Sequence, residues 1–384
     1  MSTTPLCPNP DRCGSCGWSH IPYEKQLQQK LSDINGSFKI KELTHRVSAI
    51  LPSPKTGHYR NRMDFVIDWQ GSVGLREKGK WWKVIDDHSC FLADEKIDLL
   101  YKKTRDWAKA AGLSYYDRKA NVGILRYAVI RSSTIGETMI TIVTSAPTDE
   151  VTKPQIEKAL ADLVASANPT TLIWSINNTV TDVSHGEENI VIHGKGTITE
   201  TIAGFTYHIS PNAFFQTNPH GAALLLDTVR EFAGDLTDKT LLDLYCGTGF
   251  FGVALASEAK RTVGVELVAD AIRDARINAE LNNVTVEFHD AATEAFAWQD
   301  IKPDVVIVDP PRAGMHDKAL ADLLANPPER LIYISCNYKS FARELTFLQE
   351  KYDVVAMRAV DMFPHTPHVE LVTALVRKNV EESK

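Results

Sequence analysis

LLDLYCGTGFFG, at residues 241–252, is the stretch of sequence that decides the fold of this chain. An apolar run of the kind that forms a buried strand leads into Gly247, Gly249 and Gly252, and a helical pattern follows. Glycines let the backbone turn tightly and let a ligand approach the N-terminus of the next helix. The spacing G-x-G-x-x-G occurs in sites for NAD and for S-adenosylmethionine, and also in turns that bind nothing. The stretch therefore predicts a strand, a tight turn and a helix, and it leaves the ligand open.

Strands and helices alternate on both sides of this turn. Apolar segments predict strands at residues 240–245, 262–266, 284–288, 304–308, 330–334, 353–360 and 370–377. Helical patterns cover residues 219–233, 250–258, 268–282, 316–325 and 338–350. This alternation predicts βαβ units and a doubly wound parallel sheet, in which ligands bind beyond the carboxyl ends of the strands.

The first half of the chain has a different pattern. It predicts helices at residues 22–34, 94–111 and 150–166, and strands at 63–69, 81–85, 124–131, 138–144 and 171–177. Residues 71–79 contain glycine and are expected to join two of the strands. The fold class is therefore α/β overall. We expect an α+β domain with mostly antiparallel strands at residues 1–210 and a Rossmann-like domain at residues 211–384.

Acidic residues follow two strands of the predicted parallel sheet. Glu266 ends the strand after the glycine turn, where a carboxylate can accept both hydroxyls of a ribose. Asp290 ends the third strand, where an acid can contact an adenine. Because one sheet carries the glycines and also two further polar loops, the pattern favours S-adenosylmethionine over NAD.

Those two loops carry a possible nucleophile. Asp309 begins the loop Asp-Pro-Pro-Arg after one strand, and Cys336 lies in Ile-Ser-Cys-Asn after the next. Glu370 stands between apolar neighbours, where a carboxylate is costly unless it is paired or catalytic. A lone cysteine is most often a small buried residue, but one at a strand end before a helix is better exposed. The combination favours covalent chemistry on an electrophilic ring.

Composition narrows the class of partner. Among 384 residues the net charge is −7. Residues 1–136 hold 22 Lys and Arg against 14 Asp and Glu, or +8, and the remaining 20 against 35 give −15 for residues 137–384. A basic front half fits a polyanion such as RNA, and chance scatter of charge is the alternative. No apolar run predicts a signal peptide or a membrane span, so a cytoplasmic protein is expected.

At these residues the chain resembles the RNA (uracil-5-)-methyltransferase family, whose bacterial members modify 23S ribosomal RNA or transfer RNA. The matching segments are the N-terminal cysteine motif, FFQTN at 214–218, DLYCGTGF at 243–250, DPPRAG at 309–314, ISCN at 334–337 and HVE at 368–370. The resemblance implies that Cys336 adds to carbon 6 of uracil and that Glu370 removes the carbon 5 proton. It places S-adenosylmethionine against Gln216, Tyr245, Glu266, Asp290 and Asp309, beside the turn of Gly247 and Gly249. Phe250 stands where relatives often have Asn, so a polar cofactor contact is not expected there.

Four other cysteines form a separate group. Cys7, Cys13 and Cys16 have the spacing C-x5-C-x2-C, and Cys90 follows far downstream. Four thiolates can hold zinc or an iron–sulfur cluster, which sequence alone does not separate. The resemblance implies a [4Fe-4S] cluster with a structural and RNA-positioning role.

Residues 55–83 are the expected RNA contact, since seven Lys and Arg alternate there with Tyr59, Phe65, Trp69, Trp81 and Trp82. Length and the N-terminal cysteine motif favour ribosomal RNA over the T loop of transfer RNA as the target, and a monomer is expected. Two alternatives stay open at this point. A methyltransferase that modifies an amino group would not need Cys336, and a non-catalytic RNA-binding protein would not need Glu370 or the glycine turn.

Overall fold

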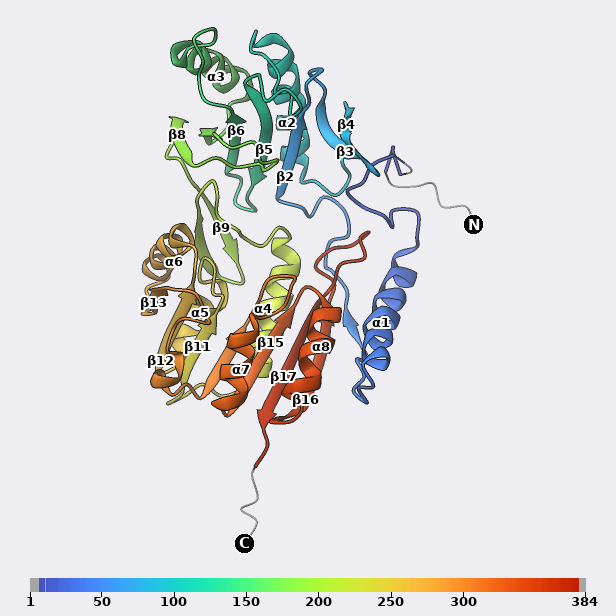
Figure 1. The fold of residues 1–384 in the computed structure, drawn as a ribbon, viewed down its shortest axis with the longest axis vertical. Coiled ribbons are helices and arrows are strands. Elements are labelled where there is room, and N and C mark those ends of the chain that lie inside the picture. The colour runs from blue at the N-terminus through green and yellow to red at the C-terminus, as the bar shows by residue number, and fades with distance from the viewer. Residues whose placement is uncertain (1–6, 11, 380–384) are drawn as a thin grey trace.

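The computed structural model describes residues 7–10 and 12–379, which fold into two sheets, one above the other in Figure 1, with helices packed on them. The lower sheet has eight strands and the upper sheet has seven. A separate two-stranded ribbon lies between them at the edge of the molecule, formed by β9 (Ile198–Ile202) and β10 (Phe205–Ile209). Among the described residues, no helix combines the length and the apolar character needed to cross a lipid bilayer.

The lower sheet confirms the predicted alternation of strands and helices. Its order is β1-β16-β17-β15-β14-β11-β12-β13. The strands are β1 (Ile50–Leu51), β11 (Thr240–Leu244), β12 (Arg261–Glu266), β13 (Glu287–Asp290), β14 (Val305–Val308), β15 (Arg330–Ser335), β16 (Tyr352–Val360) and β17 (Glu370–Arg377). From β13 to β15 all neighbouring strands pair in parallel. β12 and β13 lie on one side of β11, and β14 and β15 lie on its other side, as in a doubly wound sheet.

One strand departs from the expected parallel arrangement. β17 pairs antiparallel with both β15 and β16. The physical reason is the connection: residues 361–369 contain no helix, and a parallel return needs a longer crossover. The antiparallel direction matters because it brings the first residue of β17 to the edge where β15 ends.

Helices cover both faces of the lower sheet. One apolar core joins a face of the sheet to α4 (Pro219–Ala233), α5 (Phe250–Leu255) and α6 (Ala269–Leu281). A second core joins the other face to α1 (Tyr23–Ile40), α7 (Asp317–Ala325) and α8 (Tyr338–Leu348). The carboxyl edge of the sheet is left free of these helices and faces the upper sheet (Figure 1).

The upper sheet is mostly antiparallel, as predicted. Its order is β4-β3-β2-β5-β6-β7-β8, and only β6 and β7 pair in parallel. The strands are β2 (Arg62–Ile67), β3 (Val73–Glu77), β4 (Lys80–Asp86), β5 (Leu125–Ser132), β6 (Thr138–Thr144), β7 (Thr171–Ile176) and β8 (Glu188–His193). α2 (Glu95–Ala110) and α3 (Lys153–Ala167) pack on one face through a third apolar core. The segment 71–79, predicted as a connection, contains β3, because Gly74 lets the chain pass close to the backbone of Ile85.

The N-terminal helix belongs in space to the lower sheet. α1 packs against α8, and β1 pairs with β16 at the sheet edge. The β9–β10 ribbon leans on α6, since side chains of Asn278 and Asn282 bond to the backbone of Thr206 and His208. Parts of residues 1–210 thus complete the layer formed by residues 211–384, and a division of the chain at residue 210 stays a prediction.

Candidate active site

The ends of the strands bring most of the predicted site residues to one edge of the lower sheet. Glu266 and Asp290 are paired as the last residues of β12 and β13. β14 and β15 lie on the other side of β11, end at the same edge, and lead directly into Asp309 and Cys336. β17 starts at the same edge with Glu370, since it runs in the opposite direction.

The glycine turn has the backbone that its sequence predicts. Gly247 and Gly249 have φ of 54° and 80°, in the left-handed region that favours glycine. A side chain at Gly249 would also come within 3.1 Å of Phe288 and Val253. Tyr245 adopts φ of 62° without being a glycine. The turn therefore has a strained backbone, and its glycines leave the start of α5 accessible to a ligand.

Glu266 is tied to this turn. One of its carboxylate oxygens accepts the amide hydrogen of Gly247 at 3.1 Å, and the other accepts that of Val268 at 2.9 Å. Asp290, in contrast, is exposed at the end of β13. Leu267 and Val268 follow Glu266 with 66% and 55% of their surface exposed, which sequence reasoning did not single out. Two exposed apolar side chains beside two carboxylates suit the flat ring and the ribose of a nucleoside.

Asp243 is an acid that the sequence reading missed. It lies inside β11, fully buried, and accepts the amide hydrogen of Gly252 at 2.9 Å. Burial raises its pKa to about 8, and the nearby carboxylates of Asp309 and Glu266 add to the effect. A charged residue inside an otherwise apolar strand was the available signal.

Cys336 and Glu370 are neighbours across two strands. Ser335 of β15 pairs with Leu371 of β17, so the next residues on each side, Cys336 and Glu370, follow at the open end of the pair. The thiol is partly exposed, whereas Glu370 is buried. Burial, with Glu370 and Asp309 as further causes, raises the pKa of the Cys336 thiol to about 11.

The carboxyl groups at this edge repel one another. Burial and the charge of Asp309 raise the pKa of Glu370 to about 8, and the Arg312 guanidinium opposes the shift. Burial raises the pKa of Asp309 itself to about 7. The backbone carbonyl of Arg312 accepts hydrogen bonds at 2.9 Å from the side chains of Asn337 and Ser340. These bonds connect the loop that begins at Asp309 to the loop that contains Cys336. The edge is thus prepared for a positively charged ligand, which would relieve this repulsion.

The segment before Glu370 is fixed by α1. Lys30 forms a fully buried ion pair with Asp361 at 2.6 Å, and the Tyr23 hydroxyl donates to the second oxygen of Asp361 at 2.8 Å. Gln26 bonds both the backbone and the ring of His365. His365 is buried, and its contacts with Gln26 give it a structural role, whereas His368 is exposed.

Gln216 lies where the two sheets meet. It belongs to the segment 211–218, which leads into α4 without regular structure. The side chain of Asn61 donates to the carbonyl of Gln216 at 3.3 Å, and the Asn61 amide donates to that of Thr217 at 3.0 Å. Phe214 in the same segment is 75% exposed. The upper sheet therefore borders the site through its strand β2.

Cys7, Cys13, Cys16 and Cys90 gather in a separate buried region. Burial raises the pKa of Cys16 to about 12, and the charges of the other three thiols contribute. Amide hydrogens of Asn9 and Ser15 point to the sulfurs of Cys7 and Cys13 at 3.4 Å and 3.5 Å. Within residues 7–10 and 12–379, however, no three or more His, Cys, Asp or Glu side chains are arranged to hold a metal ion. The cluster expected from the sequence is therefore not shown, although the donor set fits one.

The chain is similar to known proteins over almost its whole length. Residues 22–378 match the family described as tRNA (Uracil-5-)-methyltransferase. A tRNA (uracil(54)-C(5))-methyltransferase of Pyrococcus horikoshii is 37% identical over 369 residues, which cover 95% of this chain and 84% of that protein. An uncharacterised RNA methyltransferase of Caldanaerobacter subterraneus is 39% identical over 386 residues, with 96% and 84% covered. The crystal structure of Pyrococcus abyssi tRNA (uracil-54, C5)-methyltransferase with S-adenosyl-L-homocysteine is similar at a TM-score of 0.80 and 34% identity, with 97% of this chain and 87% of that one covered.

The fold and the strand-end site define the class of S-adenosylmethionine-dependent methyltransferases. Since the family match extends over almost the whole chain, the chain belongs to the RNA (uracil-5-)-methyltransferase family, enzymes that methylate carbon 5 of uracil in RNA. Two finer expectations are not supported. The preference for ribosomal RNA finds no support, because two similar relatives of Pyrococcus and the solved structure are named as tRNA enzymes. The iron–sulfur type of the family is likewise not shown by any of these relatives.

Proposed function

We propose that this enzyme methylates its uridine through a covalent bond between Cys336 and carbon 6 of the base, with Glu370 as the base that removes the carbon 5 proton. The observation that carries the proposal is the pairing of β15 with β17, which brings a partly exposed thiol and a buried carboxyl group to one place. A buried acid with a raised pKa suits a group that must accept and later lose a proton near neutral pH.

The chemistry needs both groups in sequence. Cys336 loses its proton, and the thiolate adds to carbon 6, which turns the ring into an enolate with a nucleophilic carbon 5. Bound S-adenosylmethionine would supply the methyl group as an electrophile, and its sulfur would leave with the bonding electrons as neutral S-adenosylhomocysteine. Carbon 5 then carries both a methyl group and its original hydrogen. Glu370 takes that hydrogen as a proton, the double bond between carbons 5 and 6 forms again, and the bond from carbon 6 to sulfur breaks.

The same edge provides residues that would hold S-adenosylmethionine. Gly247 and Gly249 leave the start of α5 accessible, and Glu266 would face the ribose. Tyr245 and Gln216 would line the entry, and Asp290 would reach the adenine. Asp309 lies close to Glu370 and would face the positive sulfonium of S-adenosylmethionine. Burial raises the pKa of Asp309, and a nearby positive charge would favour its carboxylate form.

We propose uridine 54 in the T loop of transfer RNA as the target. Support comes from relatives of that name at 37% and 38% identity and from the solved relative at 34%. Ribosomal RNA is the second candidate. Mapping 5-methyluridine in both RNAs from cells with and without the gene separates the two, since only the true substrate loses the modification.

The decisive experiment traps the covalent step. RNA with 5-fluorouridine at the target position is incubated with enzyme and S-adenosylmethionine and run on a denaturing gel. Fluorine cannot leave as a proton, so a stable complex is expected from the wild type and none from Cys336→Ala. Parallel reactions with a tRNA transcript and a 23S fragment report the target, and omission of S-adenosylmethionine is the control. Methylation of normal RNA without any trapped complex, as an amino-group methyltransferase would give, contradicts the mechanism.

We further propose that Cys7, Cys13, Cys16 and Cys90 hold a [4Fe-4S] cluster with a structural and RNA-positioning role. The four thiols are buried near one another, and backbone amides point to two of them. Anaerobic purification should give a brown protein with about four irons per chain. Cys13→Ser should lose the iron and lower both the melting temperature and the affinity for RNA. Zinc in place of iron, or a colourless protein of unchanged stability, contradicts the proposal.

A further inference from the structure

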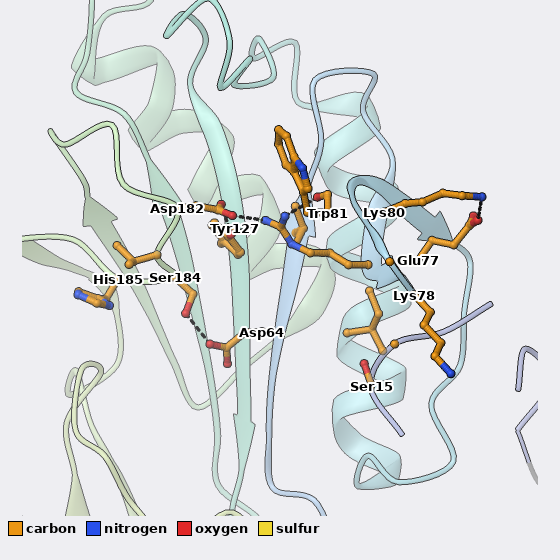
Figure 2. Close-up of a pocket in the computed structure, with 16 residues that line it drawn as sticks. Ser15, Asp64, Glu77, Lys78, Lys80, Trp81, Tyr127, Asp182, Ser184 and His185 are labelled. Atoms are coloured by element: carbon orange, nitrogen blue, oxygen red, sulfur yellow. Dashed lines mark hydrogen bonds and ion pairs between the residues drawn. The ribbon is translucent and has the colours of Figure 1, made fainter. Parts of the chain in front are cut away.

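The open face of the upper sheet carries a groove whose lining does not include Cys336. It lies opposite α2 and α3 and is bordered by β2, β3, β4 and β5 and by the loop that follows β7 (Figure 2). Two cavities of about 950 Å³ and 290 Å³ form it. They share five lining residues and are therefore one continuous surface: Val66, Arg76, Trp81, Tyr127 and Asp182.

Three tryptophans stand around the smaller cavity. Trp69, Trp81 and Trp82 are 55%, 50% and 54% exposed. Trp81 and Trp82 meet edge to face at 5.7 Å, and the Arg118 guanidinium lies over the Trp81 ring at 4.8 Å. Tryptophan buries a large apolar area when it packs, so three half-exposed rings at one cavity indicate a surface that receives a flat partner.

Two acids of the groove, Asp182 and Asp64, are paired with cations of the protein. Asp182 accepts hydrogen bonds from Arg76 at 2.6 Å and pairs with Arg118 at 2.7 Å. Asp64 is held by the side chains of Arg62 and Ser184. These pairs neutralise Asp182 and Asp64, whereas Asp68 and Asp117 at the smaller cavity bond to backbone amides and pair with no cation within the described residues.

Basic groups at the rim remain available. Glu77 is shared by Lys80 and Lys83, so together the three carry one excess positive charge. Lys78 and Lys119 are exposed and form no ion pair within the described part of the chain. Figure 2 shows the amino group of Lys80 meeting the Glu77 carboxylate, while Lys78 extends away from this pair. The arrangement therefore offers cations outside and rings inside, the combination that binds single-stranded nucleic acid.

The groove leads toward the active site. Its near end, at Asp64 and His185, is next to the segment that carries Gln216, since Asn212 donates to the carbonyl of Gly186 at 3.2 Å. β2 runs from this end to the tryptophans, a path of about 17 Å for a strand of its length. RNA bound in the groove could therefore continue to the strand ends where Cys336 lies.

We propose that this groove is a second RNA site, which binds unpaired nucleotides of the substrate and stacks at least one base on Trp81 or Trp82. The inference rests on the proposed function for its substrate, and it adds a base-binding pocket separate from the one that receives the target uridine. The pocket of about 290 Å³ lies at the small end of ligand sites, which suits one base. This second site would strengthen the binding of RNA and would take no part in the chemical step.

The test compares Trp81→Ala/Trp82→Ala with the wild type on full-length substrate RNA. Both rings are half exposed on β4, so the fold should survive, and the melting temperature verifies this. Because stacking of one base is worth about 1–3 kcal/mol, the dissociation constant and KM should rise about 5- to 150-fold, with kcat unchanged. Phe347→Ala, which removes an exposed ring from α8, is the matched control and should change neither.

A second readout locates the contact. Ultraviolet crosslinking of wild-type enzyme to RNA should attach a nucleotide to the peptide that contains Trp81 and Trp82. A rise in KM no larger than that of Phe347→Ala, or crosslinks that avoid this peptide, overturns the inference. Failure of the proposed function is distinguishable, because the wild type would then give no complex with 5-fluorouridine RNA at all.

Discussion

At the scale of single residues, the active site is a cluster of acids around one thiol. Asp243, Asp309 and Glu370 all have a raised pKa because burial penalises their charge, and Cys336 shares this environment. The Arg312 guanidinium opposes the shifts at both Glu370 and Cys336, and a backbone hydrogen bond also lowers the pKa of Cys336. The free enzyme therefore holds its nucleophile protonated, and the positive charge of a bound ligand would lower these pKa values.

Glu370 should give the reaction a characteristic pH dependence. Its pKa of about 8 means that the carboxylate form increases as pH rises through 8, so release of methylated RNA should accelerate over that range. Glu370→Gln should slow release by about 100-fold or more, whereas the complex with 5-fluorouridine RNA should still form. Rapid-quench assays from pH 6 to 9.5 measure both steps. Unchanged release in Glu370→Gln would remove Glu370 from the role of base.

The raised pKa of Glu370 also makes the free energy of unfolding depend on pH, which tests the shift independently of the reaction. The folded pKa of Glu370 lies above its unfolded value of 4.5, so its favourable contribution is complete below pH 4.5 and is lost as pH rises through 8. Glutamine at position 370 does not ionise. As pH rises from 4.5 to above 8, the free energy of unfolding of Glu370→Gln should therefore exceed that of the wild type by up to about 5 kcal/mol. Urea unfolding at pH 5 and pH 9 measures the difference.

At the scale of elements, the base is positioned by a helix that is distant in sequence. α1 holds residues 361–369 through Lys30, Gln26 and Tyr23, and β17 starts directly after this segment. The Lys30–Asp361 pair is completely buried at 2.6 Å. Breaking such a pair leaves one charge buried without a partner, which costs far more than the intact pair contributes.

Lys30→Met should therefore destabilise the enzyme by about 3–5 kcal/mol. Lys30→Met/Asp361→Leu should recover most of this loss, since it leaves no buried charge. Lys25→Met on the exposed side of the same helix is the control and should change stability by less than about 0.5 kcal/mol. Urea unfolding at pH 7 gives all three values, and a loss below 1 kcal/mol for Lys30→Met would contradict the structural role of the pair.

At the scale of the whole molecule, elements from the start of the chain complete the lower sheet. Phe38 of α1 packs against Phe341 of α8 at 6.2 Å, within a core that also contains Leu345 and Tyr352. β1 covers the edge strand β16. Both covering elements come from the first 51 residues, although the layer they complete begins after residue 210.

Residues 211–384 alone should consequently fail to fold cooperatively. The fragment would expose Phe341 and Leu345 and the edge of β16, so dye binding without a sharp thermal transition is expected. Joining residues 20–52 to the fragment through a flexible linker should restore cooperative unfolding to a large degree. A sharp transition in the bare fragment would instead support a self-sufficient domain with the predicted boundary.

The sequence by itself determined the parallel strands, the glycine turn and the loops of Asp309 and Cys336, because hydrophobic periodicity and turn residues act over short distances. It also singled out Glu370, but not the antiparallel direction of β17 that brings Glu370 beside Cys336. Only the tertiary structure decided that α1 fastens the segment before Glu370, that Asp243 joins the cluster of acids, and that three tryptophans border one groove. These are contacts between residues far apart in the chain, and no local pattern encodes which distant partner a buried charge or an exposed ring will meet.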